Sequence, residues 1–306
     1  MLNRPGTGAR AWVGGVAVVF TLMLASAAPA SPVDDARKTE VTIPAGDVVL
    51  AGTLYRPAGA TGDLPAVVLG HGSGRVTREF NRFWINASVA TGVAVLVYDK
   101  RGTGGSTGTF LKWELEETPA LFQTLAADMA HAVRWLAKQE GIDRNRVGLM
   151  GGSQAGWIMP LAASQEPIVK FVIIGEGVPL PAGVEEAHGY YLDNVSKEGE
   201  GNPSMRHVAA ADALALEYAG PSGFDPAPVL ESLTIPVLWI FGLYDGVIPV
   251  RQSIDRIGQL HKAGKRNHSI HVFPFGDHNF QNVFTKERYS VPEASRQWLQ
   301  SIGIQR

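Results

Sequence analysis

The segment that decides the fold is Val147-Gly148-Leu149-Met150-Gly151-Gly152-Ser153-Gln154-Ala155-Gly156. It starts as a short apolar run, passes through two glycines to a serine, and continues as apolar, helix-like sequence. A strand, a sharp turn with serine at its apex and a helix are typical of a nucleophile elbow, which raises the serine oxygen above a sheet. The usual pattern Gly-x-Ser-x-Gly has Ala155 where its last glycine is expected, with Gly156 one position later. Taken alone, the segment also fits a tight strand-to-helix turn capped by Ser153.

Two further strand ends carry polar residues. Asp245 and His278 each follow a short apolar run of strand length. Taken separately, Asp245 is also explained as a turn or capping residue, and His278 as an ordinary loop histidine. Because the carboxyl ends of parallel strands meet at one edge of a sheet, we expect Ser153, Asp245 and His278 to lie together. Asp277 is a poorer acid for this group, because it adjoins His278 on a turn and the two side chains are expected to point apart.

The rest of the chain alternates strand and helix patterns. Continuous apolar runs of strand length favour strands buried on both faces, as in a parallel sheet covered by helices. These runs are residues 65–69, 93–98, 147–150, 168–174, 237–241 and 270–273, preceded by a predicted hairpin at 40–43 and 48–55. The clearest helix is predicted over Ala120–Gln139, where apolar residues recur every three or four positions. The pattern predicts an α/β fold with a doubly wound, mostly parallel sheet.

One segment, at about residues 177–233, interrupts this alternation. It contains several prolines and one helix-like stretch, Met205–Tyr218, but no strong strand pattern. It is too long for an ordinary connection between a strand and a helix. We therefore predict one α/β domain at residues 31–306 that carries a helical cap insertion, placed where it would cover the ligand crevice.

The N-terminal region has the order of parts of a secretory signal peptide. Arg4 and Arg10 precede an uncharged stretch at residues 11–28, and small-residue cleavage patterns follow it. This predicts a signal at residues 1–30, export to the periplasm or the exterior, and no stable membrane insertion after cleavage. The alternative is an uncleaved N-terminal membrane anchor, because the apolar stretch approaches the length of a membrane span.

Composition excludes several classes of function. The 306 residues carry a formal net charge of −2, so there is no basic footprint for nucleic acid. The absence of cysteine excludes disulfides, thiol catalysis and zinc sites built on thiolates. No His-Glu-x-x-His motif or carboxylate cluster predicts a metal site. The oligomeric state is left open.

These motifs in this order resemble the α/β-hydrolase superfamily, over essentially all of residues 31–306. The chain is most similar to serine esterases of the dienelactone-hydrolase-like and prolyl-oligopeptidase-like branch. Two further segments carry the resemblance, Leu69-Gly70-His71-Gly72-Ser73-Gly74 and Tyr98-Asp99-Lys100-Arg101-Gly102-Thr103-Gly104-Gly105-Ser106. In that family the loop after the His-Gly pair donates an oxyanion-binding N–H, which by position is that of Ser73. The second segment is a structural turn in the family, so we expect structural roles for its Asp and Arg.

The resemblance implies hydrolysis through an acyl-enzyme. A serine hydroxyl needs a base at neutral pH, so His278 would take the proton of Ser153 and Asp245 would fix the imidazole tautomer. The N–H of Gln154, at the start of the predicted helix, would hold the developing oxyanion together with that of Ser73. No metal or organic cofactor is required.

The leading prediction is a carboxylic-ester hydrolase that acts on a small-molecule ester. One alternative on the same fold is a serine peptidase of the aminopeptidase or dipeptidyl-peptidase type, with an acidic anchor for the peptide amine among Glu176, Glu185 and Glu186. Another is an acyltransferase, in which an alcohol or sugar replaces water. A non-catalytic binding protein is the alternative from a different class, and the intact Ser, Asp and His set argues against it.

Overall fold

The computed structural model describes residues 32–197 and 204–305. The predicted signal peptide and the alternative membrane anchor fall at residues 1–30, outside the described residues. Among the helices that the structure does describe, none has both the length and the apolar character needed to cross a bilayer.

An eight-stranded sheet organises the described residues, in the order β1-β2-β4-β3-β5-β6-β7-β8. The strands are β1 (Arg37–Ala45), β2 (Val48–Arg56), β3 (Leu64–Gly70), β4 (Ala94–Tyr98), β5 (Ile142–Gly152), β6 (Val169–Gly175), β7 (Val237–Gly242) and β8 (His268–Phe273). β1 and β2 form the predicted antiparallel hairpin, and β2 also runs antiparallel to β4. All other neighbours are parallel. The predicted doubly wound, mostly parallel sheet is confirmed.

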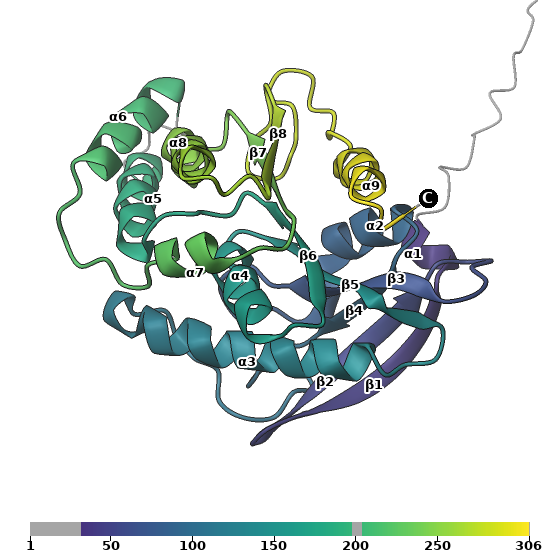
Figure 1. Ribbon diagram of the computed structural model, residues 1–306. Coiled ribbons are helices and arrows are strands. Elements are labelled where there is room, and N and C mark those ends of the chain that lie inside the picture. The colour runs from purple at the N-terminus through teal and green to yellow at the C-terminus, as the bar shows by residue number, and fades with distance from the viewer. Residues whose placement is uncertain (1–31, 198–203, 306) are drawn as a thin grey trace, which may run out of the picture. The chain divides into compact units, whose positions relative to one another are not determined.

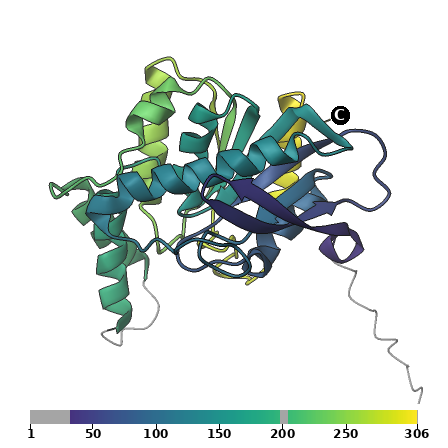
Figure 2. The same ribbon diagram turned by 90° about the horizontal axis from the view of Figure 1, so that it is seen from below.

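Helices cover both faces of this sheet (Figure 1). The helices are α1 (Pro32–Asp35), α2 (Arg82–Ala90), α3 (Thr118–Leu136), α4 (Ala155–Gln165), α5 (Ala182–Lys197), α6 (Met205–Leu216), α7 (Ala227–Ser232), α8 (Val250–Lys262) and α9 (Val291–Ser301), with short 3-10 turns at Arg78–Asn81 and Leu115–Glu117. α3 and α4 pack with α7 and α8 on one face, whereas α1, α2 and α9 pack on the other. Figure 2 shows α3 lying lengthwise across its face.

The core explains why these segments fold as they do. Every residue of β4 and β7 is buried, as expected for strands covered on both faces. α3 buries one face, on which Phe122 stacks against Trp157 of α4 with ring centroids 5.3 Å apart. Trp157 is therefore a core residue. The sheet and its helices form a rigid support for the loops at the strand ends.

The segment between β6 and β7 contains α5, α6 and α7, and no strand lies among its described residues. α5 packs against α6. The Gln252 side chain of α8 donates to the backbone carbonyl of Asp212 in α6 (2.6 Å), and His188 of α5 contacts the Val247 carbonyl (3.2 Å). These contacts connect the helices of the segment to the loop that follows β7. Its role as a cap over the ligand site remains a prediction.

Candidate active site

Ser153 lies in the sharp turn between β5 and α4. Its φ of +56° is in the left-handed region, which costs a residue with a Cβ conformational energy. Its backbone N–H donates to the carbonyl of Gly175 at the end of β6 (3.0 Å), and this bond connects the turn to the neighbouring strand. A strained serine that the surrounding structure holds in place is typical of a functional position.

Ala155, which departs from the usual motif, is accommodated by a glycine on the neighbouring strand. A Cβ on Gly70 of β3 would lie only 2.7 Å from the Cβ of Ala155, so the missing side chain leaves room for that methyl group. One position further along, a Cβ on Gly156 would lie 2.7 Å from the Cα of Gly177. The close approach of helix and strand is thus preserved, with its glycine shifted by one residue.

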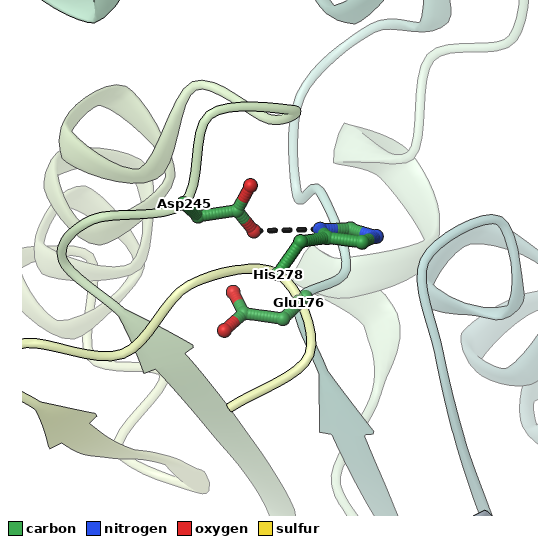
Figure 3. A group of neighbouring side chains, drawn as sticks. All are labelled: Glu176, Asp245 and His278. Atoms are coloured by element: carbon green, nitrogen blue, oxygen red, sulfur yellow. Dashed lines mark hydrogen bonds and ion pairs between the residues drawn. The ribbon is translucent and has the colours of Figure 1, made fainter. Parts of the chain in front are cut away.

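Asp245 and His278 form a hydrogen-bonded pair (Figure 3). His278 Nδ1 lies 2.7 Å from Asp245 Oδ2, while Asp245 Oδ1 accepts from the backbone N–H groups of Val247 (2.7 Å) and Ile248 (3.3 Å). Burial by itself raises the pKa of Asp245, but its interactions with His278, together with the neighbouring carboxyl of Glu176 and the hydrogen bond from the Val247 N–H, outweigh burial and hold that pKa below its ordinary value. Burial lowers the pKa of His278, but Asp245, with further contributions from Glu185 and Asp277, more than reverses this, so the net shift is upward.

Glu176 brings a second buried carboxyl group to this pair (Figure 3). It follows β6, has a φ of +46° and is 2 % exposed. Its Oε1 accepts from the N–H of Gly242 (2.7 Å). Burial first, and then the carboxylate of Asp245, raise the pKa of Glu176 well above its ordinary value. A neutral Glu176 beside a negatively charged Asp245 is the arrangement that these surroundings favour.

Among the described residues, these same three could hold a metal ion by distance, with one ligand atom from each within 4.8 Å of the others. Most of these atoms already have partners. Both oxygens of Asp245 and Oε1 of Glu176 accept hydrogen bonds, and His278 Nδ1 faces Asp245. Among the carboxylate oxygens of this group only Glu176 Oε2 has no hydrogen-bond partner, so the group offers fewer free oxygen ligands than a cation cage requires.

Ser153, His278 and Ser73 line one cavity of about 320 Å³. Ser73 lies in the loop after β3, and Gln154 lies at the N-terminus of α4. Within residues 32–197 and 204–305, no hydrogen bond joins the Ser153 hydroxyl to His278. Such bonds often tighten only when substrate is present, so the shared cavity is the relevant relationship.

Aromatic side chains form much of this cavity's wall. They are Phe80, Phe83, Trp84 and Phe280. Phe80 is 83 % exposed, so it offers apolar surface at the rim. The guanidinium of Arg288 lies over the Phe83 ring, 4.9 Å from its centroid, at the same cavity. The cavity suits a compact substrate with an apolar portion.

The other residues singled out in the sequence have structural surroundings. Asp99 accepts from the backbone and the guanidinium of Arg78 (2.7 and 2.8 Å), and Arg101 forms a two-point ion pair with Asp128 (2.7 and 2.6 Å). The structural roles expected for Asp99 and Arg101 fit these contacts. Asp277 Oδ1 instead accepts from backbone N–H groups of its own turn.

Two residues that support the site, Glu176 and Lys100, are not predicted as supporting residues from the sequence. Glu176 was considered only as an anchor for an amine, although its place directly after a strand was a usable signal. Lys100, between Asp99 and Arg101, carried no separate signal because its neighbours form a familiar turn motif. Its ammonium contacts the loops of Ser73 and Gln154.

Comparison with curated proteins finds distant relatives. The chain is 32 % identical over 142 residues to an uncharacterized 31.7 kDa protein of Escherichia coli, covering 44 % of this chain and 47 % of that protein. It is 28 % identical over 195 residues to an uncharacterized protein of Mycobacterium tuberculosis, covering 63 % of this chain and 65 % of the relative. The match thus spans about half of the first relative's length and just under two thirds of the second's.

Solved structures show the same fold at low identity. An esterase of Pyrococcus furiosus aligns with a TM-score of 0.62 and 18 % identity, covering 90 % of this chain and 95 % of the esterase. An acylaminoacyl peptidase of Pyrococcus horikoshii aligns with a TM-score of 0.62 and 18 % identity, covering 87 % of this chain and 42 % of the peptidase. A Klebsiella pneumoniae protein named as a candidate dienelactone hydrolase aligns with a TM-score of 0.57 and 20 % identity, covering 88 % of this chain and 98 % of that protein.

A family model gives a more specific assignment than these structural likenesses. The model of the prolyl oligopeptidase family matches residues 79–301, most of the chain. This range includes the elbow and the ends of β6, β7 and β8. The chain therefore belongs to the prolyl oligopeptidase family, whose members are serine hydrolases with the α/β-hydrolase fold.

Proposed function

We propose that this protein hydrolyses carboxylic esters of small or medium acyl size through an acyl-enzyme on Ser153. The observation that carries the proposal is the His278–Asp245 bond of 2.7 Å at the cavity that Ser153 also lines. With Nδ1 directed to Asp245, the imidazole has Nε2 left to exchange a proton with the serine. Asp245 is 1 % exposed and negatively charged, so it stabilises the imidazolium that forms.

The reaction has two steps, acylation of Ser153 and hydrolysis of the acyl-enzyme. His278 removes the hydroxyl proton as Ser153 Oγ attacks the ester carbonyl, and the N–H groups of Ser73 and Gln154 stabilise the oxyanion. The tetrahedral intermediate collapses, and His278 returns the proton to the departing alcohol. Water then attacks the acyl-serine with the same help from His278, which releases the acid and the free serine.

The surroundings of two of the three acidic residues, Glu176 and Glu185, disfavour the binding of a peptide amine and so support an ester substrate. An amine anchor needs a negatively charged, accessible carboxylate. Glu176 is buried beside Asp245, and Glu186 accepts from the indole N–H of Trp113 (3.0 Å). Burial raises the pKa of Glu185 to about 7, so this carboxyl is only partly charged near neutral pH.

Parallel assays with p-nitrophenyl esters of rising acyl length and with aminoacyl anilides test the proposal. We expect higher kcat/KM on short or medium esters, and labelling of Ser153 by a fluorophosphonate probe. Ser153→Ala is expected to lose turnover and labelling, whereas Ser164→Ala, an exposed serine at the other end of α4, keeps both. Higher kcat/KM on the anilide would favour a peptidase, and acyl transfer to an added alcohol would favour an acyltransferase.

Export is a separate proposal that rests on the N-terminal sequence. Arg4, Arg10 and the apolar stretch at residues 11–28 support a cleaved signal. Cell fractionation followed by N-terminal sequencing tests it. We expect the protein outside the cytoplasm and starting near residue 31, and a full-length chain in the membrane fraction would favour the anchor.

A further inference from the structure

Lys100 is a buried cation held close to both loops of the proposed oxyanion hole. It follows β4 and is 5 % exposed. Its Nζ donates to the carbonyl of Gly72 (2.6 Å), the carbonyl of Gly74 (3.3 Å) and Oε1 of Gln154 (2.8 Å). These three acceptors match the three N–H donors of an ammonium group.

The charge of Lys100 has no carboxylate partner among the described residues. The titratable groups around it are His71, which burial keeps neutral by lowering its pKa to about 3, and Arg101, which is paired with Asp128. Lys112 lines a neighbouring cavity together with Lys100. A buried charge that only neutral dipoles solvate is costly to the folded state, so its retention points to a role other than stability.

Peptide geometry connects Lys100 to the proposed oxyanion donor. The carbonyl of Gly72 and the N–H of Ser73 belong to one peptide unit, and no described peptide bond is cis. In a planar trans unit these two groups point in opposite directions. The ammonium that holds the Gly72 oxygen therefore fixes the direction of the Ser73 N–H, and it polarises that N–H by drawing electron density toward the oxygen.

The residue that carries the second proposed donor, Gln154, also contacts the ammonium of Lys100, through its side chain. The side-chain oxygen of Gln154 accepts a hydrogen bond from Lys100, and the backbone N–H of Gln154 lies at the start of α4. Lys100, which follows β4, thus holds both the loop after β3 and the turn after β5. Preorganised donors stabilise a developing oxyanion because they need no reorientation during the reaction.

We propose that Lys100 is a positioning residue that orients and polarises the N–H of Ser73 toward the oxyanion, and that its bond to the Gln154 side chain anchors the turn that carries the second N–H. The inference rests on the proposed function, because it assumes an oxyanion formed at Ser153. Lys100 contacts backbone and side-chain oxygens and is not among the residues that line the cavity of Ser153, so we expect its effect in the transition state.

Lys100→Met, which keeps the chain length but removes the charge and its donors, is the direct test. We expect kcat on a p-nitrophenyl ester to fall about 10- to 100-fold, with KM changed less than about threefold. Affinity for a trifluoromethyl ketone, which forms a tetrahedral oxyanion adduct, should fall by a similar factor. Lys138→Met, the matched change at an exposed lysine after α3, should leave all three values unchanged.

A pH profile adds a measurement that a purely structural lysine would not affect. Burial lowers the pKa of Lys100 to about 8, and His71, Arg101 and Lys112 are the surrounding ionisable groups. Wild-type kcat should decline as pH rises through this range because the ammonium loses its charge. Lys100→Met should lack this decline, and Lys100→Arg, which stays charged, should recover part of the rate and lack it too.

The outcomes separate this inference from the proposed function. If Ser153→Ala abolishes turnover but Lys100→Met keeps wild-type kcat and ketone affinity, the role of Lys100 is wrong and the nucleophile stands. If Ser153→Ala stays active, the proposed function is wrong. Should Lys100→Met fail to fold, Lys100→Gln, which also removes the charge, replaces it, and wild-type kcat and ketone affinity in that variant would overturn the inference.

Discussion

Glu176 and Asp245 place two buried carboxyl groups side by side at the ends of adjacent strands, and their pKa values shift in opposite directions. Burial and the charge of Asp245 raise the pKa of Glu176, while His278 holds the pKa of Asp245 down. Like charges this close resist simultaneous ionisation, so the pair carries one proton between them. The charged member is the one bonded to His278, and the neutral member is left to support it.

Replacement of the neutral acid by an amide should be tolerated. Glu176→Gln keeps an oxygen for the N–H of Gly242 and a donor beside Asp245, so we expect kcat at neutral pH within about threefold of wild type. Glu176→Ala removes both and leaves that buried N–H unpaired, which should destabilise the fold by about 1–3 kcal/mol. Ester assays and urea denaturation measure the two effects. An inactive but folded Gln variant would show that Glu176 must ionise.

The stability of Glu176→Gln should depend less on pH than that of the wild-type protein. A carboxyl whose pKa is raised on folding contributes stability below its unfolded value, near 4.5, and loses it as pH rises through the folded value. Wild-type Tm should therefore fall relative to that of Glu176→Gln as pH increases above 5. Thermal melts from pH 5 to 9 measure the difference, with Glu186→Gln as the control. A constant Tm difference across that range would contradict the protonated state of Glu176.

Asp245→Asn should remove most of the activity while the protein stays folded. The amide cannot stabilise an imidazolium and favours the wrong tautomer of His278, so we expect kcat to fall about 10³- to 10⁴-fold. The acid side of the kcat/KM profile should also move to lower pH, since Asp245 raises the pKa of His278 above 6.5. Background-corrected ester rates from pH 5 to 8 measure both. An unmoved acid limb would mean that another group controls it.

Two helix glycines should respond to alanine with opposite signs. At Gly156 in α4 the new Cβ would meet backbone at 2.7 Å, so Gly156→Ala should destabilise the protein by about 1–3 kcal/mol. At Gly258 in α8 nothing lies within 4 Å of the new Cβ, so Gly258→Ala should gain about 0.5–1 kcal/mol of helix propensity. Urea denaturation measures both, and a neutral Gly156→Ala would show that the elbow has more space than the structure describes.

Phe80 allows a test of substrate contact with little risk to folding, because its ring is 83 % exposed at the rim of the cavity. Phe80→Ala should raise KM for esters with large apolar groups about three- to tenfold, leave acetyl esters nearly unchanged, and alter stability by less than about 0.5 kcal/mol. An ester panel measures the first two values. The same change in KM across all acyl lengths would indicate that Phe80 does not contact the acyl group.

The sequence could predict the parts of the molecule whose signals are local. The buried strands appear as apolar runs, and the elbow and the two polar strand ends follow them in an order typical of the fold. Boundaries were less accurate where burial changes along an element. β5 begins at Ile142, earlier than its apolar run, because the polar residues 143–146 continue the strand at its exposed end. α5 was not predicted, because its mixed polar sequence has no clear apolar period.

The supporting residues of the site could not be predicted from local signals. The proton on Glu176 depends on burial beside Asp245, and the orientation of Lys100 depends on acceptors from two distant loops. Each of these properties exists only when separate strands have paired. A lysine or glutamate in a loop is ordinarily a solvated residue, so the sequence offers no reason to single it out.

The strand order has a consequence for how activity is lost. Ser153 leaves β5, which has strand neighbours on both sides, whereas His278 follows β8, which pairs only with β7 at the sheet's edge. Edge elements open locally at lower free energy than the centre of a sheet. Mild denaturant should therefore release the imidazole while the nucleophile is still held in place. Inactivation should precede global unfolding, and it should reverse quickly once the denaturant is diluted.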